Sequence, residues 1–193
     1  MLVKIYSSKS HVIIRSKRKE DLNMLNSKVH ELLNQQINKE LYSAYLYLDF
    51  SNYFKAAGLD GFANWYMVQA QEERDHAMLF YTYLQNENMP VTLEAIAKPD
   101  KVLDSHMTVL KAGLEHEEYV TSLINDIYGA AYDVRDFRTM QFLDWFVKEQ
   151  GEEETNANDM ITKMELFGSD PKSLYMLNQE LLTRAYTPPS LVL

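Results

Sequence analysis

Residues 71–80 read QEERDHAMLF, and this stretch places a carboxylate and an imidazole where a packed helix would normally be apolar. Stepping by three and four residues through the surrounding sequence traces one helical stripe that is aromatic at both ends and ionisable in the middle. The members of the stripe are Phe62, Tyr66, Gln69, Glu73, His76, Phe80 and Tyr83. A Glu one turn before a His is usually a solvated pair or a satisfied core histidine, so this stripe alone does not predict a metal site.

Length and composition predict one soluble domain. The chain has 193 residues, 46% of them hydrophobic, and no linker rich in Pro, Gly or Ser divides it. It contains no cysteine, so disulfides and thiolate metal sites are excluded and any metal must be bound by oxygen and nitrogen. No apolar run approaches the roughly 18 residues that a membrane span needs. We therefore expect no membrane contact. The lack of cysteine is compatible with the reducing cytoplasm, which is the expected location, but does not demand it.

Charge is distributed unevenly along the chain. Residues 1–19 hold six basic and no acidic side chains, which leaves 13 basic and 28 acidic residues, a net charge of −15, for the rest. Such an acidic body attracts cations. Residues 1–23 form a basic extension without the apolar segment of a secretory signal. Three interpretations of it stay open: a flexible tail preceding a true start at Met24, a transit peptide, or an arm that binds nucleic acid.

Helical periodicity predicts four long helices, over about 26–57, 61–86, 105–131 and 133–167. The break around Leu59 and Asp60 is so short that the first two helices must be antiparallel neighbours. Residues 87–104 contain Pro90 and Pro99 and no sustained period, which predicts a long connection and permits a crossover. A short fifth helix is expected over 171–185, followed by a tail over 186–193 without helical pattern. The folded domain is thus predicted to span residues 24–185.

Each long helix carries ionisable or amide side chains at the middle of its inward stripe. These are Glu40, Glu73 with His76, Glu117, and Glu153 with Gln150. In a bundle these midpoints meet at one level, where four desolvated carboxylates would repel unless they were protonated or neutralised. A pair of divalent cations is the simplest neutraliser, and carboxylates with an imidazole suit Fe, Mn or Zn.

Four segments together resemble the helix signatures of bacterial non-haem ferritins: NKELYSAYLYL (38–48), AQEERDHAMLFYTYL (70–84), LEHEEYVTSLI (114–124) and WFVKEQGEEE (145–154). The resemblance covers residues 24–185 and implies an all-α, ferritin-like four-helix bundle with a long crossover and a short fifth C-terminal helix. Di-iron bundles of this type use a Glu from each of two helices and a Glu-x-x-His from each of the other two. The chain matches three of these four contributions and has Gln150-Gly151-Glu152-Glu153 in place of the last.

In this segment the chain resembles ferritins rather than bacterioferritins, which carry the second Glu-x-x-His. Bacterioferritins also place a haem-binding Met directly after the glutamate of the second helix, where this chain has Arg74. The resemblance therefore implies iron as the metal and no haem.

The resemblance also implies a role for individual residues. Glu40, Glu73 and His76 would bind one iron, and Glu73 would bridge to a second iron held with Glu117 and Glu153. Gln150 would be a hydrogen-bonding or weak neighbour of the second iron. Tyr47 would donate a hydrogen bond or an electron to the centre, with plain core packing as its alternative.

Glu72, Glu149 and Glu152 match a third iron site that shares Glu153, and their alternative interpretation is solvated surface charge. The remaining histidines match no ligand position and are read as structural or exposed: His11, His30, His106 and His116.

Functionally, the resemblance implies iron storage in a 24-subunit shell, with Fe²⁺ oxidised by O₂ or H₂O₂ and stored as a ferric mineral. One rival is a DNA-protecting mini-ferritin, suggested by the basic extension. Against it, those relatives build the metal site between subunits and lack a fifth helix, so nucleic acid is not the expected partner. The other rival is a di-iron oxidase with an organic substrate, and the fifth helix favours the shell over it.

Overall fold

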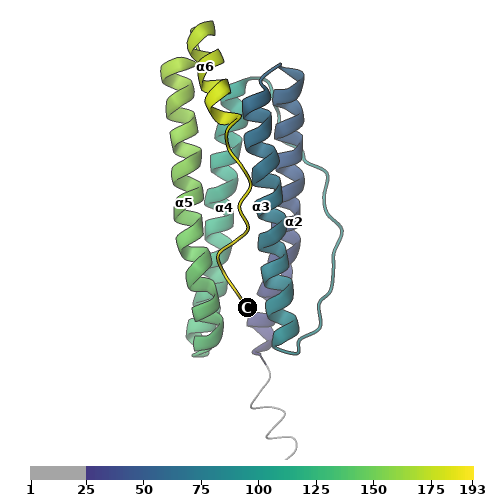
Figure 1. Ribbon diagram of the computed structural model, residues 1–193. Coiled ribbons are helices and arrows are strands. Elements are labelled where there is room, and N and C mark those ends of the chain that lie inside the picture. Colours follow the sequence, from purple (N-terminus) through teal and green to yellow (C-terminus); the bar gives the residue numbers. More distant parts are fainter. Residues whose placement is uncertain (1–24) are drawn as a thin grey trace, which may run out of the picture.

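Residues 25–193 of the computed structural model contain helices and no strands, and the predicted extension 1–23 lies outside the described residues. The helices are α2 (Ser27–Ala56), α3 (Asp60–Asn86), α4 (His106–Asp133), α5 (Phe137–Phe167) and α6 (Pro171–Leu181). Helices α2 to α5 form a bundle in which α2 and α5 run one way and α3 and α4 the other (Figure 1). The predicted all-α four-helix bundle with a long crossover and a short fifth helix is confirmed.

Local signals in the sequence set the ends of the helices. The side chain of Asn26 caps α2 by accepting from the backbone N–H of Lys28 at 2.9 Å. The α2–α3 turn uses Gly58 at a φ of 76°, which glycine adopts without steric cost. The fourth long helix starts later than predicted, at Phe137, because Asp136 caps it by accepting from the N–H of Thr139 at 3.1 Å.

The long crossover between α3 and α4 lies along α2 (Figure 1). The backbone of the crossover is bound by three side chains of α2 that are one helical turn apart: those of His30, Asn34 and Asn38. Asn34 donates to the carbonyl of Thr92 at 3.0 Å and accepts from its N–H at 2.8 Å. His30 pairs with the carbonyl of Pro90 at 2.8 Å, which gives this histidine the structural role expected of it.

The apolar core is divided into two clusters. One contains Phe50, Phe54 and Phe62, and the other contains Phe80 and Phe146. The polar residues predicted for the middle of each stripe lie between these clusters, so apolar packing above and below excludes water from them. No helix within residues 25–193 is both long and apolar enough to cross a bilayer.

Helix α6 docks on the start of α3 by reciprocal capping. No side chain from its own sequence caps α3, and instead Asn178 of α6 accepts from the N–H groups of Gly61 at 2.7 Å and Phe62 at 3.3 Å. In return Asn64 donates to the carbonyl of Leu181 at 3.2 Å. A Cβ at position 61 would lie 1.7 Å from the Asn178 carbonyl oxygen, so the contact requires glycine there.

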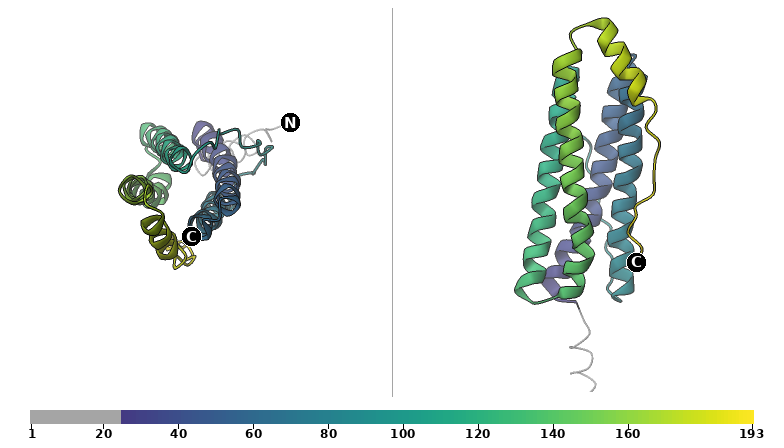
Figure 2. Two further views of the ribbon diagram at one scale, coloured as in Figure 1. Left: turned by 90° about the horizontal axis from the view of Figure 1, so that it is seen from above. Right: turned by 60° about the vertical axis from the view of Figure 1, so that its left-hand side comes forward.

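The C-terminal strap, which we define as residues 183–193, turns back and runs along the bundle beside α3 (Figures 1 and 2). Helix α6 ends at Leu181, four residues before the predicted end, and the strap contains no helix, as expected for its prolines. Sequence reasoning did not anticipate that the strap contacts the bundle. Its Ser190 Oγ accepts from Trp145 Nε1 of α5 at 3.0 Å.

We predict that Asn178→Ala lowers the free energy of unfolding by about 1 to 2 kcal/mol, because two N–H groups at the start of α3 lose their acceptor. The neighbouring Gln179 is exposed, and Gln179→Ala is the matched control. Thermal and denaturant unfolding of the two variants provide the comparison. Equal stabilities would show that α6 does not cap α3 in solution.

Candidate metal centre

Glu40 on α2 and Glu73 and His76 on α3 form a buried group of metal-type side chains. One ligand atom from each lies within 4.8 Å of the other two. Glu73 and His76 are one turn apart on the same helix, and His76 Nδ1 is 3.4 Å from Glu73 Oε2. The α2–α3 hairpin brings Glu40 to the same level, so the structure joins the three residues that the sequence assigned to the first iron.

One carboxylate oxygen of Glu40 has no donor, so a proton shared with Glu73 or a bound cation must neutralise it. Its Oε1 accepts from Gln36 Nε2 at 2.9 Å, while its Oε2 is the one buried side-chain polar atom of residues 25–193 without a hydrogen-bond partner. An unpartnered carboxylate oxygen in a core is costly unless it is protonated or bound to a cation. The donor set of two carboxylates and an imidazole is one that binds Fe, Mn or Zn.

The other two buried carboxylates belong to Glu117 on α4 and Glu153 on α5, and each is held by a neutral donor. Gln150 Nε2 donates to Glu117 Oε2 at 3.2 Å, and the Tyr47 hydroxyl donates to Glu117 Oε1. Gln69 Nε2 donates to Glu153 Oε2 at 2.8 Å. Glu117 and Glu153 do not join the group of three within 4.8 Å, so their assignment to a second iron remains a prediction.

Burial and mutual repulsion favour the neutral form of three carboxyls of the layer, those of Glu40, Glu73 and Glu117. Burial, reinforced by the charge of Glu73, raises the pKa of Glu40 to about 8. Burial and then Glu153 raise the pKa of Glu117 to about 8. The pKa of Glu73 is raised well above its usual value by burial and by Glu117 and Glu153. A bound dication must therefore displace protons from the layer.

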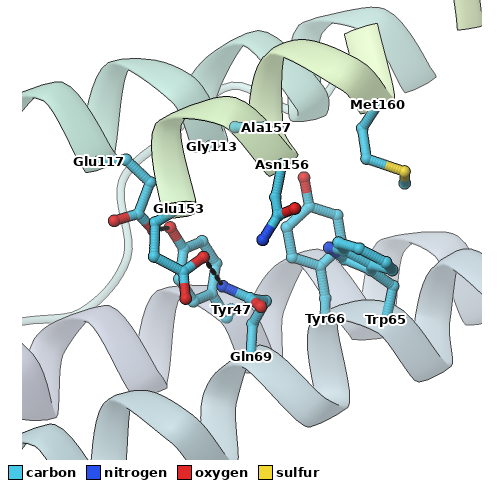
Figure 3. Close-up of a pocket in the computed structure, with 10 residues that line it drawn as sticks. All are labelled: Tyr47, Trp65, Tyr66, Gln69, Gly113, Glu117, Glu153, Asn156, Ala157 and Met160. Carbon is cyan, nitrogen blue, oxygen red and sulfur yellow. Dashed lines mark hydrogen bonds between the residues drawn. The ribbon is translucent and has the colours of Figure 1, made fainter. Parts of the chain in front are cut away.

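A small cavity of about 20 Å³ adjoins Glu117 and Glu153, which is room for one water-sized molecule (Figure 3). Tyr47, Tyr66 and Gln69 line the cavity beside the two carboxylates. The cavity therefore gives a small polar reactant a place next to the carboxylates but offers no room for a large organic substrate.

Tyr47 is buried and directed at the layer rather than at the apolar core alone. Its ring lies against Phe50 and Tyr66, with centroids 5.7 and 5.6 Å away, while its hydroxyl bonds to Glu117. Burial and then the charge of Glu117 raise the pKa of its phenol well above the usual value, so the neutral hydroxyl is the donor. Both expected features, core packing and contact with the centre, are therefore present.

The acids assigned to a third iron site do not form a group whose ligand atoms all lie within 4.8 Å of one another. Glu72 is half-buried and forms an ion pair with Arg184, Nη2 to Oε2 at 2.6 Å. Glu152 is exposed and lies 3.2 Å from Lys148 Nζ, whereas Glu149 is half-buried. Burial raises the pKa of Glu72 to about 7 although Arg184 lowers it. A third iron site at these residues stays a prediction.

The other histidines of the described chain bind protein groups. His116 Nε2 lies 2.8 Å from Ser43 Oγ, and burial lowers the pKa of His116 to about 4, which keeps the ring neutral. His106 Nδ1 is 3.1 Å from the Tyr53 hydroxyl. His11 lies outside the described residues.

Sequence reasoning missed three residues that organise the centre: Gln36, Gln69 and Arg184. Gln69 was visible as a polar member of the stripe on the second helix, and Gln36 lies one turn before Glu40. Either could have been found by asking which donors satisfy the buried carboxylates. Arg184 comes from an unpatterned segment and carried no comparable signal.

Comparison with known proteins decides the family. The family model described as "Ferritin-like domain" matches residues 30–167, which include all four bundle helices. The chain belongs to the ferritin family. A bacterial non-heme ferritin of Campylobacter jejuni is 36% identical over 156 residues, which cover 81% of this chain and 93% of that protein. A bacterial non-heme ferritin of Staphylococcus haemolyticus is 33% identical, covering 84% of this chain and 98% of that protein.

Solved structures agree with the sequence relatives. An open pore ferritin from the archaeon Archaeoglobus fulgidus superposes with a TM-score of 0.81 at 42% identity, covering 83% of this chain and 98% of that chain. A structure described as a humanized archaeal ferritin gives a TM-score of 0.83 over 85% of this chain and 99% of that one. Family and fold together support iron storage as the broad function of this ferritin.

We predict that the metal-free ferritin becomes less stable as pH rises from about 5 to 8. The folded-state pKa values of Glu40 and Glu117 lie above the unfolded values, so the stabilisation is complete at low pH and is lost as pH rises through about 8. Each such group contributes up to about 1.4 kcal/mol per pH unit within this range.

Glu40→Gln removes one of these titrations and should flatten the pH dependence, whereas the exposed Glu31→Gln on the same helix should not. The measurement is the unfolding temperature of metal-free protein across the pH range. A wild-type stability that is constant or rises over this range would contradict the protonation of Glu40 and Glu117 in the folded, metal-free protein.

Proposed function

We propose that this ferritin oxidises Fe²⁺ at a di-iron centre within each chain and stores the product as ferric mineral inside a homo-oligomeric shell. One Fe²⁺ would bind to Glu40, Glu73 and His76, and Glu73 would bridge to a second held by Glu117 and Glu153. Gln150 would stay beside the second ion as a hydrogen-bond donor or weak ligand. Iron is here the substrate, and no haem is expected to take part.

In the proposed reaction two Fe²⁺ ions each lose one electron, and O₂ takes up both electrons and two protons to become H₂O₂. Peroxide can serve as the oxidant in the same way, because two further electrons and protons convert it to water. The carboxyl groups of the layer release protons when the Fe²⁺ ions bind, which leaves anionic ligands that favour the higher charge of Fe³⁺. The neutral Tyr47 hydroxyl would orient Glu117 and would be the nearest side chain able to donate an electron.

The unpartnered Glu40 Oε2 in a layer of four buried carboxylates is the observation that carries the proposal. These carboxylates come from four helices, and each additional negative charge raises the cost of leaving the layer without a cation. A purely structural layer would be expected to pair each oxygen with a donor. The open oxygen instead lies beside an imidazole and a second carboxylate.

A shell of 24 chains is proposed from the likeness to ferritins, and the exposed apolar side chains of α6 are consistent with a contact between chains. Tyr175 and Met176 are exposed on the side of α6 away from α3, while Leu177 and Leu181 are buried against the bundle. Within the shell the acidic surface would favour entry of cations. A cytoplasmic location is proposed on the same likeness.

The two rival functions are less well supported. The candidate ligands all lie within one chain, which argues against a mini-ferritin site shared between subunits, and nucleic acid is not proposed as a partner. The cavity beside Glu117 holds about 20 Å³, which argues against an oxidase with an organic substrate. A third iron bound by Glu72, Glu149, Glu152 and Glu153 would have to compete with the Arg184 ion pair.

We predict that Glu73→Ala and Glu117→Ala each slow rapid Fe²⁺ oxidation by at least about a hundredfold, since each removes a direct ligand. Assembly should survive, because loss of a buried acid relieves repulsion in the metal-free layer. Glu118 is exposed next to Glu117, and Glu118→Ala is the control. Stopped-flow absorbance of ferric product gives the rates. Wild-type rates in Glu73→Ala would refute the site.

We also predict that the purified protein elutes as a large shell containing non-haem iron. Size-exclusion chromatography with metal analysis and a visible spectrum tests size, iron content and haem together. A protein that elutes as a single chain or a dimer, with no more than two irons per chain after loading, would favour the oxidase over storage.

A further inference from the structure

The C-terminal strap places one cationic side chain beside the candidate metal centre. Arg184 is mostly buried, with its side chain 17% exposed, and its guanidinium lies over the Trp65 ring at 4.0 Å from the centroid. Its Nη2 donates to Glu72 Oε2 at 2.6 Å and also to the amide oxygen of Gln69. A positive charge therefore already occupies the pocket in which Glu72 would meet a metal ion.

Gln69 connects this arginine to the centre itself. The amide oxygen of Gln69 accepts from Arg184, so its amide nitrogen is turned the other way and donates to Glu153 Oε2 at 2.8 Å. While the strap is in place, one lone pair of Glu153 is engaged by an N–H donor. If Arg184 leaves, Gln69 is free to rotate and Glu153 can turn that oxygen towards a cation.

Few apolar contacts hold the strap against the bundle. It buries little apolar surface, because most of its side chains are exposed and only Arg184, Pro189 and Leu191 are partly covered. Segments with so few buried contacts open at low free-energy cost. Pro188 and Pro189 keep the strap extended rather than helical.

The strap also links α3 and α5, whose side chains meet directly, as Gln69 does with Glu153 and Phe80 with Phe146. Backbone contacts join α2 to α3, α4 to α5 and α2 to α4, but within the described chain α3 and α5 have no Cα atoms within 8 Å of each other. The strap spans these two helices: Tyr186 bonds to Asp75 on α3, and Ser190 bonds to Trp145 on α5 (Figure 2). It thus adds a second connection between α3 and α5 beside the polar layer.

We propose that the C-terminal strap is a latch on the metal centre, in which Arg184 takes the place of a metal cation at Glu72 and holds Glu153 through Gln69. A further cation binds at Glu72 only when the strap lifts. The proposal rests on the proposed metal centre and adds to it a gate that responds to the cation load.

The chain carries a natural reporter for this motion. Its two tryptophans, Trp65 and Trp145, both contact the strap, one through the Arg184 guanidinium and the other through Ser190. Lifting the strap must change the surroundings of both indoles. Trp145 also lies edge-on to His76, with ring centroids 5.5 Å apart, so a metal ion at His76 affects its emission as well, and the Trp65 signal is the one that follows the Arg184 guanidinium.

The test titrates the metal-free full chain with Zn²⁺, which binds oxygen and nitrogen ligands without redox chemistry. Calorimetry counts the ions, and the Trp65 emission follows the strap. In the wild type, we expect the Trp65 emission to change only with ions bound after the centre is filled. In Arg184→Gln, the further ion should bind at least about tenfold more tightly, equivalent to about 1.4 kcal/mol, and the emission should already match the lifted state.

Three variants make the result specific. Arg138→Gln removes the same charge from an exposed ion pair with Glu87 at 2.8 Å, remote from the centre, and should behave as the wild type. Arg184→Lys keeps the positive charge and should still exclude the ion. Adding Glu72→Gln to Arg184→Gln should abolish the tighter binding.

The latch is refuted if Arg184→Gln binds Zn²⁺ as the wild type does while the ions at Glu40, Glu73 and His76 bind normally, a result that leaves the proposed function intact. It is also refuted if Arg184→Lys gains the ion, or if the tighter binding survives Glu72→Gln. Failure of the wild type to bind any ion at Glu40, Glu73 and His76 would instead reject the proposed function. Circular dichroism of each variant confirms that the comparison is between folded proteins.

Discussion

The structure depends on one electrostatic constraint: four carboxylates lie at one level of an apolar core. Aromatic clusters on both sides remove water from this level, so each carboxylate must find a proton, a donor or a cation. Gln36, Gln69, Gln150 and Tyr47 supply donors to three of the four, and one oxygen of Glu40 is left open. Burial raises the pKa values of Glu40, Glu73 and Glu117, so these carboxyls favour the protonated form and would release protons when metal ions bind.

The position of this layer follows from how the helices are held. Glu73 and His76 lie at one level because they are one turn apart on α3. The α2–α3 hairpin brings Glu40 to this level, the crossover brings Glu117, and the capped α4–α5 turn brings Glu153. Asn34 and Asn38 attach the crossover to α2, and Asn178 of α6 caps the start of α3. These contacts do not involve the buried carboxylates, yet they help to fix the heights at which the helices meet.

Much of this was predictable from sequence, because a polar residue inside an apolar helical stripe is visible in one dimension. The stripes of the four long helices together predicted the bundle and the layer, and the candidate ligand atoms of Glu40, Glu73 and His76 do converge. Helix ends were less predictable, since Asp136 caps a turn that periodicity alone had placed within the fourth helix. The strap could not be predicted, because Arg184 lies 112 residues from Glu72 in a segment without periodicity.

A crystal of the protein soaked in Fe²⁺ or Zn²⁺ under anaerobic conditions, with anomalous scattering recorded at the metal absorption edge, is the most direct measurement. Two peaks are expected on either side of the Glu73 carboxylate, one in contact with Glu40 and His76 and the other with Glu117 and Glu153. Peaks confined to exposed acids, with the buried carboxylates still unoccupied by metal, would contradict a metal centre in the core of this ferritin.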